Sequence, residues 1–252
     1  MRICTFNVNS IRSRLEIVQN LIKEFDIDIL CMQEIKVQNE KFPRIDEEFE
    51  CIVNGQKRLN GVAICSRFPI DDYETEFEGE REEARFVYSL INGLHIVNVY
   101  VPLGDNYSQK FEFKMFFYEK LFEFLKRFNL EKENVILCGD MNVAFSDLDV
   151  WDADVWEGEV TFLPEEKAMI NRLLNMGFVD ILREFYPKER IFTFYDYKGA
   201  KVYKNEGLRL DYFFLSKPLL KRVESLEVLT SLRRKRKPTP SDHVPLILEL
   251  KD

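Results

Sequence analysis

Residues 135–143 read VILCGDMNV, in which four apolar side chains are followed at once by Gly139-Asp140-Met141-Asn142. A short apolar run bounded by turn-forming residues indicates a strand that is buried on both faces. A carboxylate placed against such a strand costs free energy unless it is paired or bound to a cation. The segment therefore predicts a buried strand that ends in a chemically significant acid.

The same arrangement, polar residues next to an apolar run, recurs along the chain. The other clusters are Asn7 with Asn9, Gln33 with Glu34, Asp211, and Asp242 with His243. One such acid is usually a cap or half of a salt bridge, but five clusters without matching buried Lys or Arg favour a shared site. Ligands collect at the carboxyl ends of strands in open sheets. Carboxylate and amide oxygens suit Mg²⁺, or Mn²⁺ in its place, rather than zinc.

Short apolar runs alternate with helical patterns over the whole chain. Strands are expected at 3–8, 28–32, 62–65, 85–91, 94–100, 134–138, 210–215 and 244–250, and helices at 11–25, 110–128 and 165–175. Asn92-Gly93 joins two of these strands and is typical of a tight β-hairpin. Mixed strands and helices without a linker favour one layered α/β domain, residues 1–252, with two sheets.

The composition supports a large core in a protein of the cell interior. Of 252 residues 46% are hydrophobic, and an α/β domain of this size buries about three quarters of its unfolded surface. No apolar run of about 18 residues and no secretory segment occurs, so we expect a soluble cytoplasmic protein without membrane contact. The five Cys residues lack CxxC spacing, which predicts reduced thiols and no zinc site. Burial is expected for the four that lie in short apolar runs, Cys4, Cys31, Cys65 and Cys138.

Net charge and local charge point in different directions on whether the protein binds DNA. The formal net charge of −8 does not suggest a DNA-binding protein, although net charge averages over all faces. The dense basic run consists of Arg233, Arg234, Lys235, Arg236 and Lys237. Taken alone, this run is as well explained by a solvated loop as by phosphate contacts. Its position a few residues before the Asp242-His243 cluster favours phosphate contacts.

Histidine is informative because the chain has two. His95 lies in the alternating strand LHIVNVY and is expected to be structural. His243 lies between a loop and a strand, flanked by Asp242 and Pro245. Asp211, or another buried acid, could hold one ring nitrogen, and that arrangement would make His243 catalytic.

Six short segments together form a pattern that resembles a known protein family. They are FNVNSIR (6–12), MQEIK (32–36), YVP (100–102), CGDMNV (138–143), GLRLD (207–211) and PSDH (240–243). In this order, over nearly the whole chain, they resemble the motifs of the exonuclease III and AP endonuclease family. The resemblance implies a DNase I-like fold, a four-layer αββα sandwich of two packed mixed β-sheets flanked by helices.

The resemblance also implies roles for the polar residues. Glu34, helped by Asn7, looks like the principal metal ligand. Asp140 looks like the base that activates water or a ligand to a second ion, and Asn142 would meet the phosphoryl oxygen or a metal. The remaining implied roles are Tyr100 at the scissile phosphate, Asp211 orienting His243, and His243 with Asp242 binding phosphate or a second ion. Whether Asp140 or His243 is the base, and whether one or two metals bind, stays open.

Substrate contacts follow from the same resemblance. Phe194, Leu208 and Leu210 stand where the family is thought to admit an extrahelical abasic sugar, although plain core packing explains them equally well. The residues expected to grip DNA are Asn9, Arg12, Lys36, Arg209 and the basic run from Arg233 to Lys237. Phosphate contacts of this kind make binding strongly salt-dependent.

The implied activity is Mg²⁺-dependent incision of double-stranded DNA at abasic sites, with removal of nucleotides or blocking groups from 3′ ends. We expect a monomer that acts in the cytoplasm, associated with the nucleoid through DNA. A DNase I-like phosphoesterase for inositol phosphates or sphingomyelin is the alternative enzyme, but no membrane-facing apolar loop is evident. A non-catalytic DNA-binding protein is disfavoured because the implied catalytic residues are all present.

Overall fold

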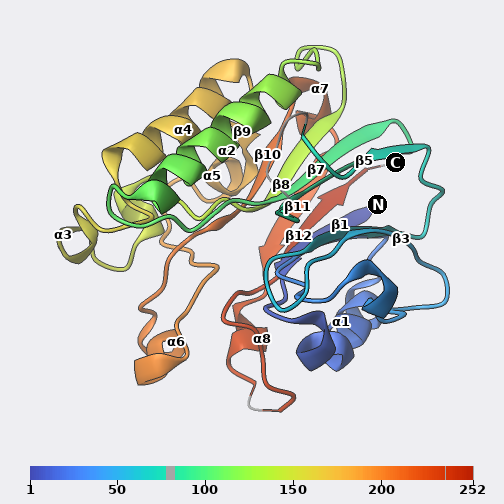
Figure 1. Cartoon of the computed structure of the whole chain (residues 1–252), viewed down its shortest axis with the longest axis horizontal. Coiled ribbons are helices and arrows are strands. Elements are labelled where there is room, and N and C mark those ends of the chain that lie inside the picture. Colours follow the sequence, from blue (N-terminus) through green and yellow to red (C-terminus); the bar gives the residue numbers. More distant parts are fainter. Residues whose placement is uncertain (78–82, 236, 252) are drawn as a thin grey trace.

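Two six-stranded sheets form the centre of the protein, in a computed structural model that describes residues 1–77, 83–235 and 237–251 (Figure 1). The first sheet has the order β11-β12-β1-β2-β4-β3, and the second has the order β5-β6-β7-β8-β10-β9. The strands of the first sheet are β1 (Arg2–Asn7), β2 (Ile29–Gln33), β3 (Glu50–Asn54), β4 (Val62–Ser66), β11 (Val223–Val228) and β12 (Leu246–Leu250). Those of the second are β5 (Asp72–Glu74), β6 (Phe86–Ile91), β7 (Leu94–Tyr100), β8 (Val135–Asp140), β9 (Val179–Asp180) and β10 (Asp211–Leu215).

Helices cover the outer faces of both sheets, with α2 and α4 on the second and α1 on the first (Figure 1). The α-helices are α1 (Ile11–Phe25), α2 (Gln109–Leu125), α3 (Ala153–Trp156), α4 (Pro164–Met176), α5 (Ile181–Phe185), α6 (Lys201–Lys204), α7 (Lys217–Leu220) and α8 (Thr230–Arg233). Short 3₁₀ turns are η1 (Asn39–Lys41), η2 (Asp147–Asp149) and η3 (Lys198–Ala200). Among the described residues, no helix is both long and apolar enough to cross a membrane.

The alternation of side chains along β8 explains why residues 135–138 are all apolar. Ile136 and Cys138 pack between the two sheets, and Val135 and Leu137 pack under α2 and α4. Because a strand alternates its side chains between two faces, burial of both faces requires consecutive apolar residues. Three core layers result, one between the sheets and one under each helical layer. The expected four-layer αββα sandwich is confirmed.

The Asn92-Gly93 hairpin is also confirmed. Ile91 pairs with Leu94, which leaves a two-residue turn in which Asn92 has φ 50° and Gly93 has φ 72°. Two positive φ angles in succession define the type I′ turn that this dipeptide favours.

The strands missing from the sequence-based expectation are all at sheet edges. They are β3, β5, β9 and β11, which end the two sheets. An edge strand has one unpaired side and is often short and polar, so it lacks a continuous apolar run. Strand β11, for example, carries Glu224 and Glu227 on exposed positions.

One expectation about cysteine is wrong. Cys51 and Cys65 form a disulfide across β3 and β4, where they are direct partners in the strand register. Their separation of 14 residues gave no signal, because the pairing depends on the register of two strands rather than on sequence spacing. Cys4, Cys31 and Cys138 are buried free thiols, as expected.

A buried amide joins the two sheets. Asn98 on β7 is fully buried and donates from Nδ2 to the carbonyl oxygens of Met32 and Ala63 in the first sheet, both at 3.0 Å. Its Oδ1 accepts from Gln33 Nε2 at 2.7 Å. Gln33 directly precedes Glu34, so this network fixes the end of β2 against the second sheet.

We predict that Asn98→Leu lowers the free energy of unfolding by about 2–5 kcal/mol, because two buried carbonyl groups and the Gln33 amide each lose a hydrogen bond. Urea unfolding measures the loss. Ser89→Ala on the adjacent strand β6 is the matched control, since the buried Ser89 hydroxyl has no hydrogen-bond partner among the described residues. Equal losses for both variants would contradict a role for the inter-sheet bonds.

Candidate active site

The polar clusters meet at one rim because of strand direction. Strands β1 and β2 are parallel, as are β7 and β8, so all four carboxyl ends can carry side chains to a common edge. Strand β10 is antiparallel to β8 and begins there, with Asp211 directly opposite Asp140. The segment before β12 adds His243, which forms an isolated bridge with Phe194.

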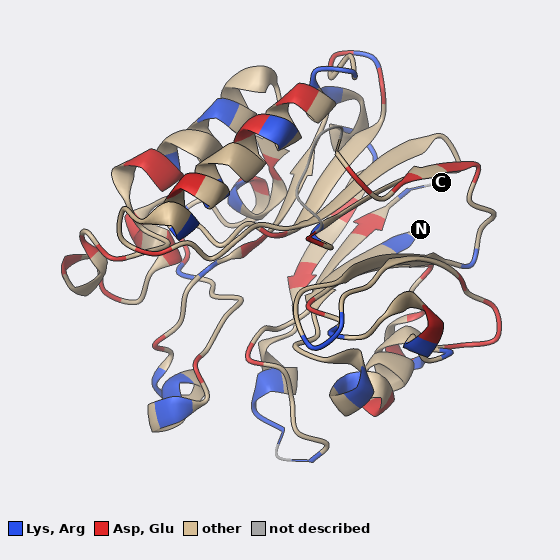
Figure 2. Cartoon of the chain, viewed as in Figure 1, with Lys and Arg blue, Asp and Glu red and all other residues tan. Residues whose placement is uncertain are grey.

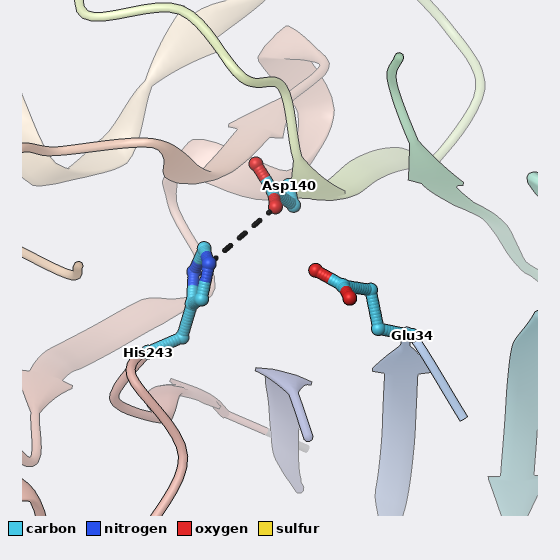
Figure 3. Close-up of side chains that lie close together, drawn as sticks. All are labelled: Glu34, Asp140 and His243. Carbon is cyan, nitrogen blue, oxygen red and sulfur yellow. Dashed lines mark ion pairs between the residues drawn. The ribbon is translucent and has the colours of Figure 1, made fainter. Parts of the chain in front are cut away.

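Three side chains from both sheets converge at this rim (Figure 3). One ligand atom each from Glu34, Asp140 and His243 lies within 4.8 Å of the others, a group able to hold a metal ion. Asp140 Oδ2 is 3.7 Å from His243 Nε2. Asp140 and His243 are buried and Glu34 is half-buried, so the group is open to solvent on the Glu34 side. The structure thus brings together three residues that are far apart in the chain.

Asn7 lies at the centre of the group as a hydrogen-bond donor. Its Nδ2 is 2.9 Å from both Glu34 Oε1 and Asp140 Oδ2, and 3.4 Å from His243 Nε2. Its Oδ1 accepts from the backbone N–H of Asn9. Asn7 was predicted to help bind the metal, which requires its amide oxygen. In the structure its amide nitrogen faces the two carboxylates instead, because carboxylates accept hydrogen bonds.

His243 is held by the predicted partner. Its Nδ1 is 2.8 Å from Asp211 Oδ2, and both side chains are buried. Burial alone would lower the pKa of His243, but the carboxylates of Asp211 and Asp140 raise this pKa to about 10. Burial raises the pKa of Asp140 to about 7, with Asp211 acting in the same direction and His243 against it. A cationic imidazole beside the carboxylates suits an anionic substrate.

Tyr100 and Lys36 complete the surroundings of Glu34. Burial, and then the charges of Glu34 and Asp140, raise the pKa of Tyr100, so its phenol stays neutral and can donate. Lys36 Nζ is 2.7 Å from Glu34 Oε2 and 2.5 Å from Asn9 Oδ1. Burial would raise the pKa of Glu34, but hydrogen bonds from Lys36 and Asn7 lower it. Lys36 therefore stabilises the Glu34 carboxylate directly.

The backbone at this rim is strained. Asn9, Glu34, Lys36 and Asn142 have positive φ angles of 42°, 51°, 55° and 48°. Such conformations cost about 1–3 kcal/mol each in residues other than glycine and concentrate at functional sites. Backbone bonds to neighbouring segments hold them, among them Ser10 N to Glu34 O at 2.7 Å.

Asp242 and Asn142, which were also predicted as metal ligands, lie outside the group formed by Glu34, Asp140 and His243. Asp242 is not in the group of potential metal ligands, and its Oδ1 accepts from Asn9 Nδ2 at 3.0 Å. Asn142 Nδ2 donates to the carbonyl of Val101 at 2.8 Å, and its backbone N–H donates to Asp140 Oδ1 at 2.9 Å. Asn142 therefore supports the Asp140 carboxylate through its backbone.

The three apolar residues predicted for a sugar pocket lie beside His243. The Phe194 ring is half-buried, with its centroid 5.1 Å from that of His243. Leu208 and Leu210 are both 3% exposed and pack against a small cluster that includes Trp156. Phe194 is thus the member of the three with surface to offer a substrate.

Two of the residues predicted to contact DNA, Arg209 and Arg233, are buried in the structure. Arg209 is fully buried, with Nε 2.6 Å from Asp149 Oδ1 and Nη1 2.9 Å from Asp180 Oδ1. Its guanidinium also lies 4.2 Å from the Tyr212 ring centroid. Arg209 is a structural ion-pair residue, and its position next to Leu208 and Leu210 in the motif gave no indication of this.

The basic run divides into a structural and an exposed part. Arg233 is buried, and its guanidinium donates to the carbonyl oxygens of Tyr195 and Asp196, so it is not free to contact DNA as predicted. Arg234, Lys235 and Lys237 are exposed, as is Arg12 on α1. Arg236 lies outside the described residues.

Two hydroxyl groups that sequence reasoning did not single out support the site. Thr193 Oγ1 accepts from the backbone N–H groups of Leu210 and Asp211, both at 3.0 Å. Ser241 Oγ donates to Asn7 O at 2.7 Å and accepts from His243 N–H. Ser241 lies within the PSDH segment, whereas nothing in the local sequence distinguishes Thr193.

The chain is similar to known proteins over nearly its whole length. Residues 4–243 match the model of the Endonuclease/Exonuclease/phosphatase family. The chain is 30% identical to the exodeoxyribonuclease III of Haemophilus influenzae, over the full length of both proteins. It belongs to the exonuclease III and AP endonuclease family. The resemblance found in the sequence is thereby confirmed, and the chain is a hydrolase of the nuclease type.

Solved structures of the family superpose closely. An AP endonuclease from Archaeoglobus fulgidus is 38% identical, with a TM-score of 0.95 and complete coverage of both chains. A 3′ phosphatase from Neisseria, bound to a product DNA hairpin, is 31% identical, with the same TM-score and coverage. These relatives differ in their named activities, although they share the fold.

We predict that Arg209→Met destabilises the protein by about 3–5 kcal/mol, because the buried Asp180 loses its ion-pair partner and the buried Asp149 keeps Arg183 alone. Urea unfolding gives the value. Arg127→Met is the control, since Arg127 forms an exposed ion pair with Glu74 and such pairs contribute about 0–1 kcal/mol. A loss for Arg209→Met no larger than the control would show that Arg209 is not required for stability.

Proposed function

We propose that the protein is a Mg²⁺-dependent nuclease for damaged double-stranded DNA. It cleaves the backbone 5′ to abasic sites, leaving a 3′-hydroxyl and a 5′-deoxyribose phosphate, and it removes nucleotides or blocking groups from 3′ ends. The observation that carries the proposal is the approach of Glu34, Asp140 and His243 to within 4.8 Å at one rim. Two carboxylates and a cationic imidazole so close together suit a metal ion and a phosphate.

The donor set fits a magnesium ion held chiefly by the oxygens of Glu34 and Asp140. When bound, such an ion acts as a Lewis acid on the phosphoryl and leaving oxygens. Mn²⁺ would be accepted by the same oxygens. The imidazole nitrogen of His243 is a weaker match for Mg²⁺, so we assign it to the substrate.

The side chains divide the remaining work. Asp140 accepts the proton of the attacking water, and His243, fixed by Asp211, binds a phosphate oxygen. Tyr100 donates from its neutral phenol to the scissile phosphate or its leaving oxygen. Asn7 keeps the two carboxylates in register through bonds of 2.9 Å to each.

The substrate assignment is supported by the relatives and by the charge pattern. Lys and Arg residues occur on α6, α8 and the segment that follows α8, and these elements project from the same side of the molecule (Figure 2). Phe194, next to His243, would contact an extrahelical sugar that has lost its base, because the missing base lowers the cost of flipping. We further propose that the enzyme acts as a monomer on chromosomal DNA in the cytoplasm.

We predict that a labelled duplex with one tetrahydrofuran abasic analogue is incised with Mg²⁺ and stays intact with EDTA. Glu34→Gln should lower kcat by at least about 100-fold, because it weakens cation binding. Glu119→Gln, an exposed carboxylate of α2 away from the rim, is the control and should keep wild-type kcat. Denaturing gels separate the products.

An intact duplex with Mg²⁺ at low salt would refute abasic incision. Activity of the wild type on inositol phosphates, with none on DNA, would instead support a DNase I-like phosphoesterase. Unchanged cleavage by Glu34→Gln would remove Glu34 from the catalytic centre.

The exposed basic residues give a second prediction. The triple variant Arg234→Ala, Lys235→Ala and Lys237→Ala should bind abasic DNA more weakly. The slope of log Kobs against log[salt] should become shallower by about 0.9 per lost phosphate contact. The matched control replaces Lys126, Arg127 and Lys132, three exposed residues near the opposite end of β8, with alanine. Equal slopes for the two triple variants would show that the basic run does not contact phosphates.

A further inference from the structure

A buried lysine connects two loops at the rim. Lys114 on α2 is fully buried, and its Nζ donates to the carbonyl oxygens of Asn142 at 2.7 Å and Leu103 at 3.1 Å. Its third bond goes to the Glu166 carboxylate. Since an ammonium group has three donors, all of them are used. Two of its three partners are backbone carbonyls of the loops that follow β7 and β8.

Glu166 is fixed in turn. It is fully buried on α4, and its second oxygen accepts from the backbone N–H of Leu163 at 3.0 Å, at the start of that helix. The ion pair therefore links α2, the first turn of α4 and the two rim loops. Gly104, with φ 77°, lies so close to the lysine that a Cβ there would be 3.1 Å from Lys114 Cδ.

Stability alone gives little reason for this ion pair. A buried pair is often no better than well-packed apolar residues of similar volume, because both charges must leave water. Lys114 and Glu166 face each other between two helices that also pack through buried apolar residues, among them Phe117 and Ile170. Methionine or leucine would suit the same positions by volume and helix preference.

The carbonyl that Lys114 binds belongs to a strained residue. Asn142 has φ 48°, its backbone N–H donates to Asp140 Oδ1, and its side chain donates to Val101 O. The conformation is thus held on three sides, with Lys114 on the carbonyl side. Loss of the Lys114 bond would remove one of these three restraints on the conformation of Asn142, and the orientation of its N–H toward Asp140 depends on that conformation.

We propose that Lys114 is a positioning residue for the nuclease reaction. Through the carbonyl oxygens of Asn142 and Leu103 it fixes the two loops that directly follow Asp140 and Tyr100, the last residues of β8 and β7, with Glu166 as its counter-ion. The inference rests on the proposed function, because it concerns the same site. Lys114 does not touch the substrate, so its effect is on the geometry of Asp140 and not on binding.

The test compares variants in the abasic-duplex assay with Mg²⁺. Lys114→Met with Glu166→Met removes both charges, so no unpaired charge is buried. It should lower kcat by about 10- to 100-fold, with KM changed less than about threefold, because misplacement by about 1 Å has effects of this size. Glu166→Gln keeps an oxygen for Lys114 and should lower the melting temperature while kcat stays near wild type.

The matched control is Arg172→Met with Glu119→Met. This exposed pair, 2.5 Å apart, joins the same two helices but touches no rim carbonyl. Its kcat should equal that of the wild type. Asn142→Ala is made in the wild type and in the double methionine variant. It should lower kcat less in the double variant, because the backbone conformation of Asn142 is already lost there.

The outcomes separate the two claims. A wild type without nuclease activity refutes the proposed function. An active wild type in which the double methionine variant keeps its kcat refutes the role of Lys114. The role of Lys114 is also refuted if kcat falls in proportion to the melting temperature in both Glu166→Gln and the double methionine variant. If the double methionine variant does not fold, Lys114→Leu with Glu166→Leu takes its place: a loss of kcat with KM nearly unchanged supports the role, and unchanged kcat refutes it.

Discussion

Two carboxylates held side by side at a partly buried rim are the constraint on which the rest of the structure depends. Glu34 comes from one sheet and Asp140 from the other, and each shares the amide nitrogen of Asn7 at 2.9 Å. Charges of the same sign in a desolvated place repel each other, so the arrangement costs free energy. A cation bound between the two carboxylates would offset this repulsion and would at the same time attract a phosphate.

The surrounding structure prevents the carboxylates from moving apart. Asn98 and Gln33 tie the end of β2 to the second sheet, and Thr193 fixes the start of β10 at Asp211. The buried ion pair of Lys114 with Glu166 holds the loop after β8. These polar groups are buried and largely satisfied, which makes each position specific as well as stable.

Local patterns in the sequence predicted two sheets in one layered α/β domain and a shared site for the polar clusters, and the family resemblance implied the four-layer sandwich and the roles of Glu34, Asp140 and His243. Central strands, buried on both faces, carry continuous apolar runs, and the acids at their ends are visible beside them. Edge strands, the Cys51–Cys65 pair and the burial of Arg209 depend on which segments become neighbours. Arg209 lies in a motif of the site, yet Asp149 and Asp180, which neutralise it, are remote in sequence.

The most direct test of the central claim is the effect of Mg²⁺ on the free energy of unfolding, without DNA. A cation that binds the folded site stabilises it by about 2.7 kcal/mol at one hundred times Kd. We expect Mg²⁺ to stabilise the wild type and to have little effect on Glu34→Gln. Equal stabilisation of both proteins, or none of the wild type at any Mg²⁺ concentration, would contradict a cation site between Glu34 and Asp140.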